Sequence, residues 1–296
     1  MPATPLNVIS IQSHVAYGHV GNAAAVFALQ RLGIEVWPVH TVQFSNHTGY
    51  PEFQGQVFAA GDIARLIDGL DARGALARCD ALLTGYVGDP ALGAVILDTA
   101  RRIRAASPRA LWACDPVMGD AGKGLFVRAG IPAFMKDQAL PAADILTPNL
   151  FELEILSGSK PGSMQEVCAA AAALLARGPK IVLVTSLSPQ GNAAGEMEMV
   201  AVTEAGAWRV AYPRLPFSPN GAGDAVAALF LGFYLKSGSV PQALGEAASA
   251  IFEVLQTTLD SGETELQLVA AQDRLEAPRR VFAAEVLRPR KGFPNG

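Results

Sequence analysis

The sequence predicts an α/β fold in which a mostly parallel central sheet carries helices on both faces. Short apolar runs rich in β-branched residues alternate along the chain with longer segments of helical periodicity. The runs are continuously apolar rather than alternating, which is typical of strands covered on both faces. This strand and helix rhythm favours a doubly wound sheet, and such sheets bind ligands beyond the carboxyl ends of their strands.

The predicted elements follow one another in a regular order. The strands that the apolar runs predict are 7–11, 35–39, 81–84, 110–114, 144–147 and 180–184. The helices that the periodicity predicts between them are 21–32, 91–106 and 164–176. Two further strands, 197–202 and 208–212, are joined by Glu204-Ala205-Gly206 and predict a small antiparallel edge hairpin. The pattern then predicts helix to about Arg274.

Length and composition indicate one domain. The chain has 296 residues, of which 50% are hydrophobic, and this suffices for one large core. We expect residues 1–296 to form a single domain with an ordered core of about 6–287 and a frayed tail from Arg288. The net charge of −4 and the scattered basic residues argue against nucleic-acid binding. No secretory signal and no apolar stretch of about 18 residues is found, so we expect a cytoplasmic protein without membrane association.

The cysteines and histidines do not suggest a metal site. Cys79, Cys114 and Cys168 lie in mostly apolar surroundings without CxxC spacing. We therefore expect them to be reduced thiols in the core. The four histidines fit no metal-binding helix pattern.

The glycine motif Asn220-Gly221-Ala222-Gly223-Asp224 is the clearest candidate for chemistry. It runs directly into the apolar stretch 225–235, which predicts a helix. Free backbone N–H groups at the start of a helix favour an anion, and Asp224 would lie close enough to accept a proton. The motif therefore fits a phosphoryl-transfer site. By itself it fits equally well a tight turn with Asp224 as the helix cap.

Polar residues also follow three of the predicted strands. Ser13 comes after the first strand, where a turn hydroxyl is the simpler interpretation. Asp115 directly follows the 110–114 strand. It could hold Mg²⁺ through water, orient a phosphate or cap the next turn. Asn149 and Glu152 open a helix on one face, where their spacing favours a capping pair over contact with a metal-bound water.

The sequence lacks three common motifs, and their absence argues against three classes of enzyme. Gly124 follows Lys123 where a Walker loop would place a hydroxyl residue, so a P-loop NTPase is not expected. No Gly-x-Gly-x-x-Gly follows the first strand, which argues against dinucleotide oxidoreductases. No Gly-x-Ser-x-Gly is present either, which argues against α/β-hydrolases.

Taken together, these motifs resemble those of the ribokinase-like superfamily, and within it the chain is similar to pyridoxal kinases. The superfamily motifs are the Gly-Ala-Gly-Asp loop at 221–224 and Asn-x-x-Glu at 149–152. The matches to pyridoxal kinases are Ser10 to Val15, Gly18 to Asn22, Thr41 to Tyr50, Thr84 to Tyr86, Cys114 to Val117 and Thr147 to Asn149. The likeness spans about Val8 to Arg274, and its ten-residue run 41–50 is far more specific than a glycine motif.

The resemblance implies a ribokinase-like three-layer sandwich and a role for each site residue. Asp224 would be the catalytic base, and Gly221, Ala222 and Gly223 would form the anion hole. The residues implied to bind pyridoxal are Ser13, Val20, Thr48, Tyr86 and Asp224. The residues implied to surround the ATP phosphates and their cations are Asp115, Thr147, Asn149, Glu152, Gly221 and Gly223, with Asp115 and Glu152 at the metal. The residues implied to lie beside the nucleotide are Thr185, Ser186, Pro213, Arg214, Leu215 and Pro216.

Three departures from the family pattern bear on substrate and affinity. Thr185 stands where some bacterial relatives place a lysine, so this strand end would contact phosphate by hydrogen bonds. Ala225-Val226-Ala227 lacks the hydroxyl that often follows the aspartate, which would weaken phosphate binding. Phe217-Ser218-Pro219-Asn220 stands where sugar kinases carry Asp-Thr-Thr, which favours a vitamin over a sugar.

The resemblance thus implies ATP-dependent phosphorylation of the 5′-hydroxymethyl group of pyridoxal, giving pyridoxal 5′-phosphate in vitamin B6 salvage. It also implies Mg²⁺, a monovalent cation such as K⁺ or Na⁺, and a homodimer. The nearest alternative is a hydroxymethylpyrimidine kinase of the same superfamily. Two others are a pyridoxal phosphate-binding protein with little turnover and a structural α/β protein whose motifs are only caps and turns.

Overall fold

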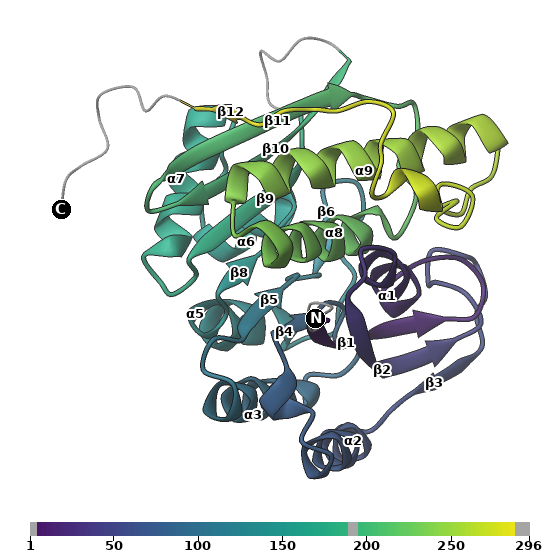
Figure 1. Cartoon of the computed structure of the whole chain (residues 1–296), viewed down its shortest axis with the longest axis vertical. Coiled ribbons are helices and arrows are strands. Elements are labelled where there is room, and N and C mark those ends of the chain that lie inside the picture. Colours follow the sequence, from purple (N-terminus) through teal and green to yellow (C-terminus); the bar gives the residue numbers. More distant parts are fainter. Residues whose placement is uncertain (1–4, 189–194, 288–296) are drawn as a thin grey trace.

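The computed structural model describes residues 5–188 and 195–287, which form a ten-stranded sheet with helices on both faces (Figure 1). The strands of this sheet are β1 (Asn7–Val15), β2 (Glu35–Phe44), β3 (Gly55–Val57), β4 (Ala81–Thr84), β5 (Leu111–Cys114), β8 (Ile145–Leu146), β9 (Ile181–Leu187), β10 (Glu196–Thr203), β11 (Gly206–Pro213) and β12 (Glu285–Val286). Their order is β12-β11-β10-β9-β8-β5-β4-β1-β2-β3. All neighbours from β2 to β9 run parallel, which confirms the predicted fold class.

Helices cover the two faces of the sheet with separate apolar cores. The helices are α1 (Asn22–Arg31), α2 (Ala60–Ala72), α3 (Leu92–Ala106), α4 (Ile131–Phe134), α5 (Leu140–Ala142), α6 (Leu150–Ser157), α7 (Met164–Leu175), α8 (Ala222–Ser237) and α9 (Val240–Ser261). One face packs against α1, α8 and α9, and the other against α2, α3, α6 and α7 (Figure 1). Successive strand residues such as Val8 and Ile9 enter opposite cores, which explains the continuously apolar runs.

The predicted antiparallel hairpin is confirmed as β10 and β11, whose register places Thr203 opposite Gly206. It is not the edge of the sheet, however. The short strand β12 pairs with Trp208 and Arg209 on the outer side of β11. Both residues of β12 are exposed, so no apolar run predicts this strand from sequence.

The prediction of helix to about Arg274 is wrong beyond α9. Gly262 ends α9 with a φ of 71°, in the left-handed conformation that often terminates a helix. The chain then continues in turns as far as a short 3₁₀ turn at Gln272–Arg274. Leu266, Leu268 and Leu275 are fully buried in this segment, and the seven positions between Leu268 and Leu275 are a spacing that a helix would also place on one face. The tail expected to fray from Arg288 lies outside the described residues.

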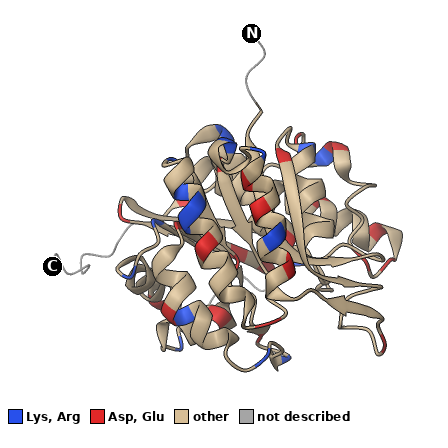
Figure 2. Ribbon diagram, turned by 90° about the horizontal axis from the view of Figure 1, so that it is seen from below, with Lys and Arg blue, Asp and Glu red and all other residues tan. Residues whose placement is uncertain are grey.

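Charged side chains are interspersed on the surface and pair locally. Figure 2 shows basic and acidic residues side by side on the same helices. Arg102, for example, lies 2.7 Å from Asp68 and 2.6 Å from Asp71. Exposed pairs of this kind contribute about 0–1 kcal/mol each, so they do not determine the fold. No helix in the described part of the chain is long and apolar enough to cross a membrane.

The three cysteines are buried and free, which confirms the expectation of core thiols. Burial raises the pKa of the Cys79 thiol to about 11. This thiol is therefore protonated at neutral pH and behaves as a small apolar side chain.

Candidate active site

The start of α8 provides free backbone donors. Its first intrahelical bond runs from the Ala225 N–H to the Gly221 carbonyl at 3.0 Å. The N–H groups of Ala222, Gly223 and Asp224 therefore have no partner within the helix. No side chain caps this end. The alternative in which Asp224 caps the helix is wrong, because the cap position is Gly221 and Asp224 lies in the first turn.

Gly221 is required at this position for two reasons. Its φ is 86°, which strongly favours glycine. A Cβ atom there would also lie 1.8 Å from the His19 carbonyl oxygen. The loop after β1 and the loop 220–223, here called the anion-binding loop after its predicted role, are therefore packed directly against each other.

Asp224 is half-buried at the base of this arrangement. Burial raises the pKa of its carboxyl group to about 6, and the backbone N–H of Gly21 partly offsets that rise. Gly21 in turn packs on Ser13, because a Cβ at Gly21 would lie 2.4 Å from the Ser13 Oγ. The predicted base and the predicted substrate hydroxyl contact are thus adjacent.

Asp115 and Thr147 come from the ends of neighbouring strands, β5 and β8. The Thr147 Oγ1 donates a hydrogen bond to Asp115 Oδ1 at 2.9 Å. Asp115 is only 6% exposed. Its pKa is raised well above the usual range by burial and by the carboxylates of Glu152 and Asp224. Three acidic groups thus gather at the carboxyl end of the sheet, as the positions of the motifs predicted.

Glu152 and Asn149 form the capping box of α6. The Glu152 N–H donates to Asn149 Oδ1 at 2.9 Å, and the Asn149 N–H donates to Glu152 Oε2 at 2.9 Å. The other carboxylate oxygen, Oε1, accepts from Met118 N at 2.8 Å, and Asn149 Nδ2 donates to the Gly119 carbonyl at 2.8 Å. The capping interpretation is confirmed, and the pair also holds the loop after β5. Burial raises the Glu152 pKa to about 7 despite these donors.

The loop after β5 folds back as a small hairpin of β6 (Gly119–Asp120) and β7 (Gly124–Leu125). Lys123 lies at its turn. The Lys123 Nζ is 3.4 Å from Asn220 Oδ1, in the loop that leads into α8. The hairpin therefore reaches across to the anion-binding loop.

The other residues predicted to bind pyridoxal lie past the ends of adjacent strands. Ser13 is near the end of β1, Thr48 follows β2, and Tyr86 follows β4; β1 pairs with both other strands. Thr48 is exposed, whereas Ser13 is buried. Val20, in the loop after β1, is half-buried beside His19, whose carbonyl packs on Gly221.

The residues predicted to lie beside the nucleotide form two groups. Thr185 is buried, and its N–H donates to the Pro148 carbonyl at 3.0 Å, next to Asn149. Ser186 has a φ of 56° and is the one non-glycine residue with positive φ in the described ranges. The segment Pro213 to Pro216 begins at the last residue of β11 and is mostly exposed. Leu215 packs on the core, and the Arg214 guanidinium lies 3.4 Å from Ser188 Oγ.

Comparison with known proteins identifies the family. A family model described as phosphomethylpyrimidine kinase matches residues 68–268. A pyridoxal kinase PdxY from Rubrobacter xylanophilus is 56% identical over 92% of this chain and 94% of its own length. Its counterpart from Deinococcus radiodurans is 53% identical over 96% of this chain and 97% of its own length. The chain belongs to the pyridoxal kinase family.

A solved structure of this family has the same fold. The pyridoxal kinase from Leishmania donovani in complex with ADP and pyridoxamine matches with a TM-score of 0.88 and 29% identity. The match covers 95% of this chain and 99% of that one. The ribokinase-like sandwich expected from sequence is therefore confirmed.

One buried residue near the site was missed by sequence reasoning. Glu265 is 7% exposed and contacts His47 and Tyr50, both within the run 41–50 that the pyridoxal kinase resemblance rests on. No local pattern around Glu265 indicates this role, because its partners lie 218 and 215 positions away. Only an independent prediction of long-range contacts would have found it.

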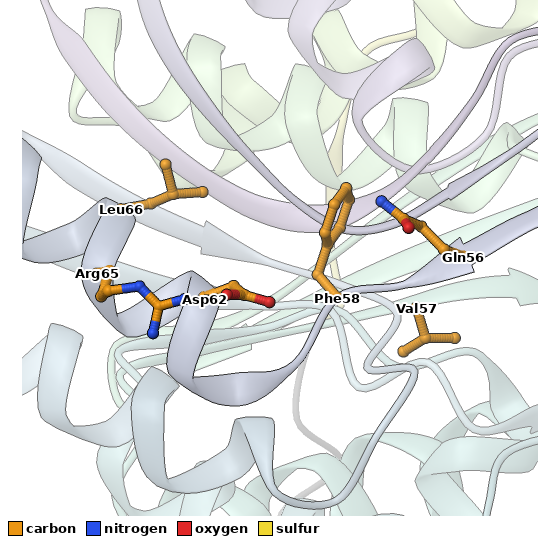
Figure 3. Close-up of a pocket in the computed structure, with 6 residues that line it drawn as sticks. All are labelled: Gln56, Val57, Phe58, Asp62, Arg65 and Leu66. Atoms are coloured by element: carbon orange, nitrogen blue, oxygen red, sulfur yellow. Dashed lines mark hydrogen bonds and ion pairs between the residues drawn. The ribbon is translucent and has the colours of Figure 1, made fainter.

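A groove of about 490 Å³ lies apart from these residues, between β3 and α2 (Figure 3). Its lining residues are Gln56, Val57, Phe58, Asp62, Arg65 and Leu66. None of the predicted site residues of this pyridoxal kinase family member lines the groove. Asp62 and Arg65 instead pair with each other one turn apart on α2. The groove is therefore not part of the candidate active site.

Proposed function

We propose that this chain transfers the γ-phosphoryl group of ATP to the 5′-hydroxymethyl oxygen of pyridoxal. The observation that carries the proposal is the start of α8, where free backbone N–H groups lie beside Asp224 and against the loop after β1. A helix N-terminus favours an anion, and a carboxylate beside it can accept the proton of an attacking hydroxyl. The relatives at 56% and 53% identity are pyridoxal kinases, which supports pyridoxal as the acceptor.

Asp224 serves as the general base. A pKa of about 6 leaves its carboxylate mostly ionised at neutral pH, yet more basic than an ordinary aspartate. An alcohol is a far weaker acid than this group. The proton therefore leaves the hydroxyl late, when bonding to phosphorus is advanced.

The backbone of the anion-binding loop stabilises the transferred group. The N–H groups of Gly221 to Gly223 and the helix dipole favour negative charge on the equatorial phosphoryl oxygens. These donors are fixed by the packing of Gly221 on the His19 carbonyl, so little reorganisation is needed during the reaction. The loop thereby supplies alignment and charge stabilisation, which are the main requirements of phosphoryl transfer.

The described residues contain no group of three metal-ligating side chains that could hold a metal by itself, so a divalent cation here would be held by Asp115 together with the phosphates. Asp115 is buried near Glu152 and Asp224, and their mutual repulsion helps to raise its pKa. Mg²⁺ is usually held by one or two carboxylates together with phosphate oxygens and waters. We assign Asp115 as its protein ligand, with Glu152 acting through water because backbone N–H groups occupy its oxygens. When bound, Mg²⁺ supplies positive charge that offsets the charge of the phosphates.

The second candidate is hydroxymethylpyrimidine, which the family model favours by its description as a phosphomethylpyrimidine kinase. A pyrimidine with a hydroxymethyl group would place the same reacting oxygen beside Asp224. The loops after β1, β2 and β4 would then contact a six-membered ring with a second nitrogen and different substituents. The two functions differ only in the acceptor, so a comparison of acceptors separates them.

A homodimer and activation by K⁺ or Na⁺ complete the proposal. Sedimentation of the purified chain should give twice the mass of 30.9 kDa. The kinase rate in K⁺ or Na⁺ should exceed the rate in tetramethylammonium at equal ionic strength. A monomeric mass would contradict the homodimer. Equal rates in all three salts would contradict activation by a monovalent cation.

The experiment that tests the function is an acceptor panel. Purified protein is incubated with MgATP and with pyridoxal, pyridoxine, pyridoxamine or hydroxymethylpyrimidine, and the phosphorylated product is quantified by chromatography. We expect the highest kcat/KM among the B6 vitamers. A higher kcat/KM for the pyrimidine would replace pyridoxal as the substrate. Binding of pyridoxal without consumption of ATP would contradict kinase activity.

A further inference from the structure

Glu265 joins three segments that are far apart in sequence. Its Oε1 atom accepts a hydrogen bond from the Tyr50 hydroxyl at 2.8 Å and from His47 Nε2 at 3.0 Å. Its Oε2 atom faces Gly18, where a Cβ atom would lie 1.9 Å away. The carboxylate is therefore in contact with the loop after β1 and with the loop after β2. These loops carry Val20 and Thr48, which the family resemblance implies to bind pyridoxal.

The contact with His47 fixes the position of Thr48. A carboxylate oxygen can only accept, so His47 carries its proton on Nε2 and leaves Nδ1 as an acceptor. The Gly49 N–H donates to this Nδ1 at 3.1 Å. One imidazole therefore holds the residues on both sides of Thr48. The Tyr50 ring stacks on the same imidazole, with 4.6 Å between ring centroids.

The segment that carries Glu265 is packed into the core and also contacts the anion-binding loop. Leu266 and Leu268 are fully buried, and the Gln267 N–H donates to Thr258 Oγ1 at 3.0 Å. A Cβ atom at Gly221 would lie 3.3 Å from Leu266. The same segment thus touches both substrate loops and the start of α8.

One carboxylate oxygen of Glu265 is in an unfavourable environment. Its Oε2 atom is buried and has no hydrogen-bond partner in the described residues. A buried acceptor without a partner generally costs stability. Local costs of this kind are expected where a residue is kept for function.

We propose that Glu265 is a positioning residue for the pyridoxal pocket, which holds the loops after β1 and β2 in register with the anion-binding loop. The inference rests on the proposed function and adds a residue to it. Glu265 does not touch the reacting atoms. It acts by ordering Thr48 and its neighbours before the acceptor binds, so it lowers the cost of binding the acceptor.

The test compares Glu265→Ala, Glu265→Gln and the control Glu263→Ala. Glu263 is exposed and lies two positions earlier in the same segment. Glu265→Ala should raise the KM for pyridoxal about tenfold, which corresponds to the loss of one charge-assisted hydrogen bond, and leave the KM for ATP within about twofold. Glu265→Gln keeps an oxygen that accepts from His47 and Tyr50, so it should recover most of the affinity. The control should match wild type.

The outcomes that overturn the inference are equally specific. An unchanged pyridoxal KM in Glu265→Ala, or an equal rise in the KM for both substrates, would show that Glu265 is only structural. If Glu265→Ala does not fold, Tyr50→Phe removes a single donor from the loop and should raise the pyridoxal KM alone, by about threefold. An unchanged KM in Tyr50→Phe would then overturn it. If the wild type and Glu263→Ala do not phosphorylate pyridoxal, the proposed function fails, and titration of pyridoxal binding to the same variants decides the role of Glu265.

Discussion

The two halves of the candidate site are built differently. In the phosphate half each residue lies at a place that local sequence marks: Asp115 and Thr147 directly follow their strands, and Asp224 lies in the first turn of α8. The pyridoxal half depends on contacts over more than 200 positions, since Glu265 holds His47 and Tyr50. Strand ends and helix starts can thus specify chemistry, whereas the shape of the acceptor pocket requires the folded chain.

The largest effect should come from the base in the phosphate half. Asp224→Ala removes the proton acceptor, so we expect kcat to fall by a factor of about 10² to 10⁴ with little change in either KM. Steady-state kinetics with pyridoxal and MgATP measure this. Thermal unfolding serves as the control for folding. Unchanged turnover would remove Asp224 from the mechanism.

Gly221→Ala should be the next most damaging change. The new Cβ would collide with the His19 carbonyl and would also strain a residue with a φ of 86°. We expect a fall in kcat together with a stability loss of about 1–3 kcal/mol. Gly238→Ala is the matched control, because Gly238 ends the same helix with a φ of 66° and has nothing within 4 Å. It should lose stability without losing activity, and equal loss of kcat in both variants would contradict this account of the anion-binding loop.

The raised pKa values of Asp224 and Glu152 should affect how both activity and stability depend on pH. Asp224 must be ionised to act as a base, so kcat/KM should fall about tenfold per pH unit below its pKa of about 6. The contribution of the two groups to stability should show the opposite trend. The folded pKa values of Asp224 and Glu152, about 6 and about 7, exceed their ordinary values of 3.8 and 4.5, so the native state binds more protons across this range. Their contribution to the free energy of unfolding without nucleotide and Mg²⁺ should therefore decrease as the pH rises from about 4 to 7. Lowered pKa values at His40 and Asp144 act in the opposite direction, so the measured quantity is the difference in unfolding free energy between wild type and Asp224→Asn across this range. A difference that does not change with pH in denaturant titrations would show that the Asp224 pKa is not raised.

The smallest effect should come from the capping box of α6. Glu152→Gln cannot accept at both oxygens, so we expect a stability loss of about 0.5–2 kcal/mol and a higher Mg²⁺ requirement. The control is Glu166→Gln in the capping box of α7, where Glu166 and Ser163 make the same reciprocal bonds. That variant should lose comparable stability with an unchanged Mg²⁺ dependence. If Glu152→Gln also changes only stability, Glu152 has no part in cation binding.

The sequence predicted the fold well because its signals are local. Continuous apolar runs gave the parallel strands, and helices such as α3 and α7 were placed within about a residue of their ends. The predicted extension of helix beyond α9 failed because buried leucines continue into a segment without helix, where Leu268 and Leu275 are seven positions apart, as on one face of a helix. The strands β3, β6, β7 and β12 were missed because they are short and, unlike the equally short β8, have no fully buried apolar run: β3 and β12 are exposed, and β6 and β7 are only partly buried.

In the candidate site, too, features set by local sequence could be predicted, whereas contacts between distant segments could not. Asn149 and Glu152 have the spacing of a capping box, and the structure contains that box. Two further hydrogen bonds, from the Met118 N–H to Glu152 and from Asn149 Nδ2 to the Gly119 carbonyl, could not be predicted, because they join segments about 30 residues apart. Glu265 was missed for the same reason over a much longer separation.

The most direct test of the division between the two halves is one set of steady-state measurements on Asp224→Ala and Glu265→Ala. Each variant is assayed for kcat, the KM for pyridoxal and the KM for ATP. The account predicts that Asp224→Ala loses kcat at nearly unchanged KM, whereas Glu265→Ala mainly raises the KM for pyridoxal. If both variants lose the same parameter to a similar extent, chemistry and acceptor positioning are not separated in this molecule.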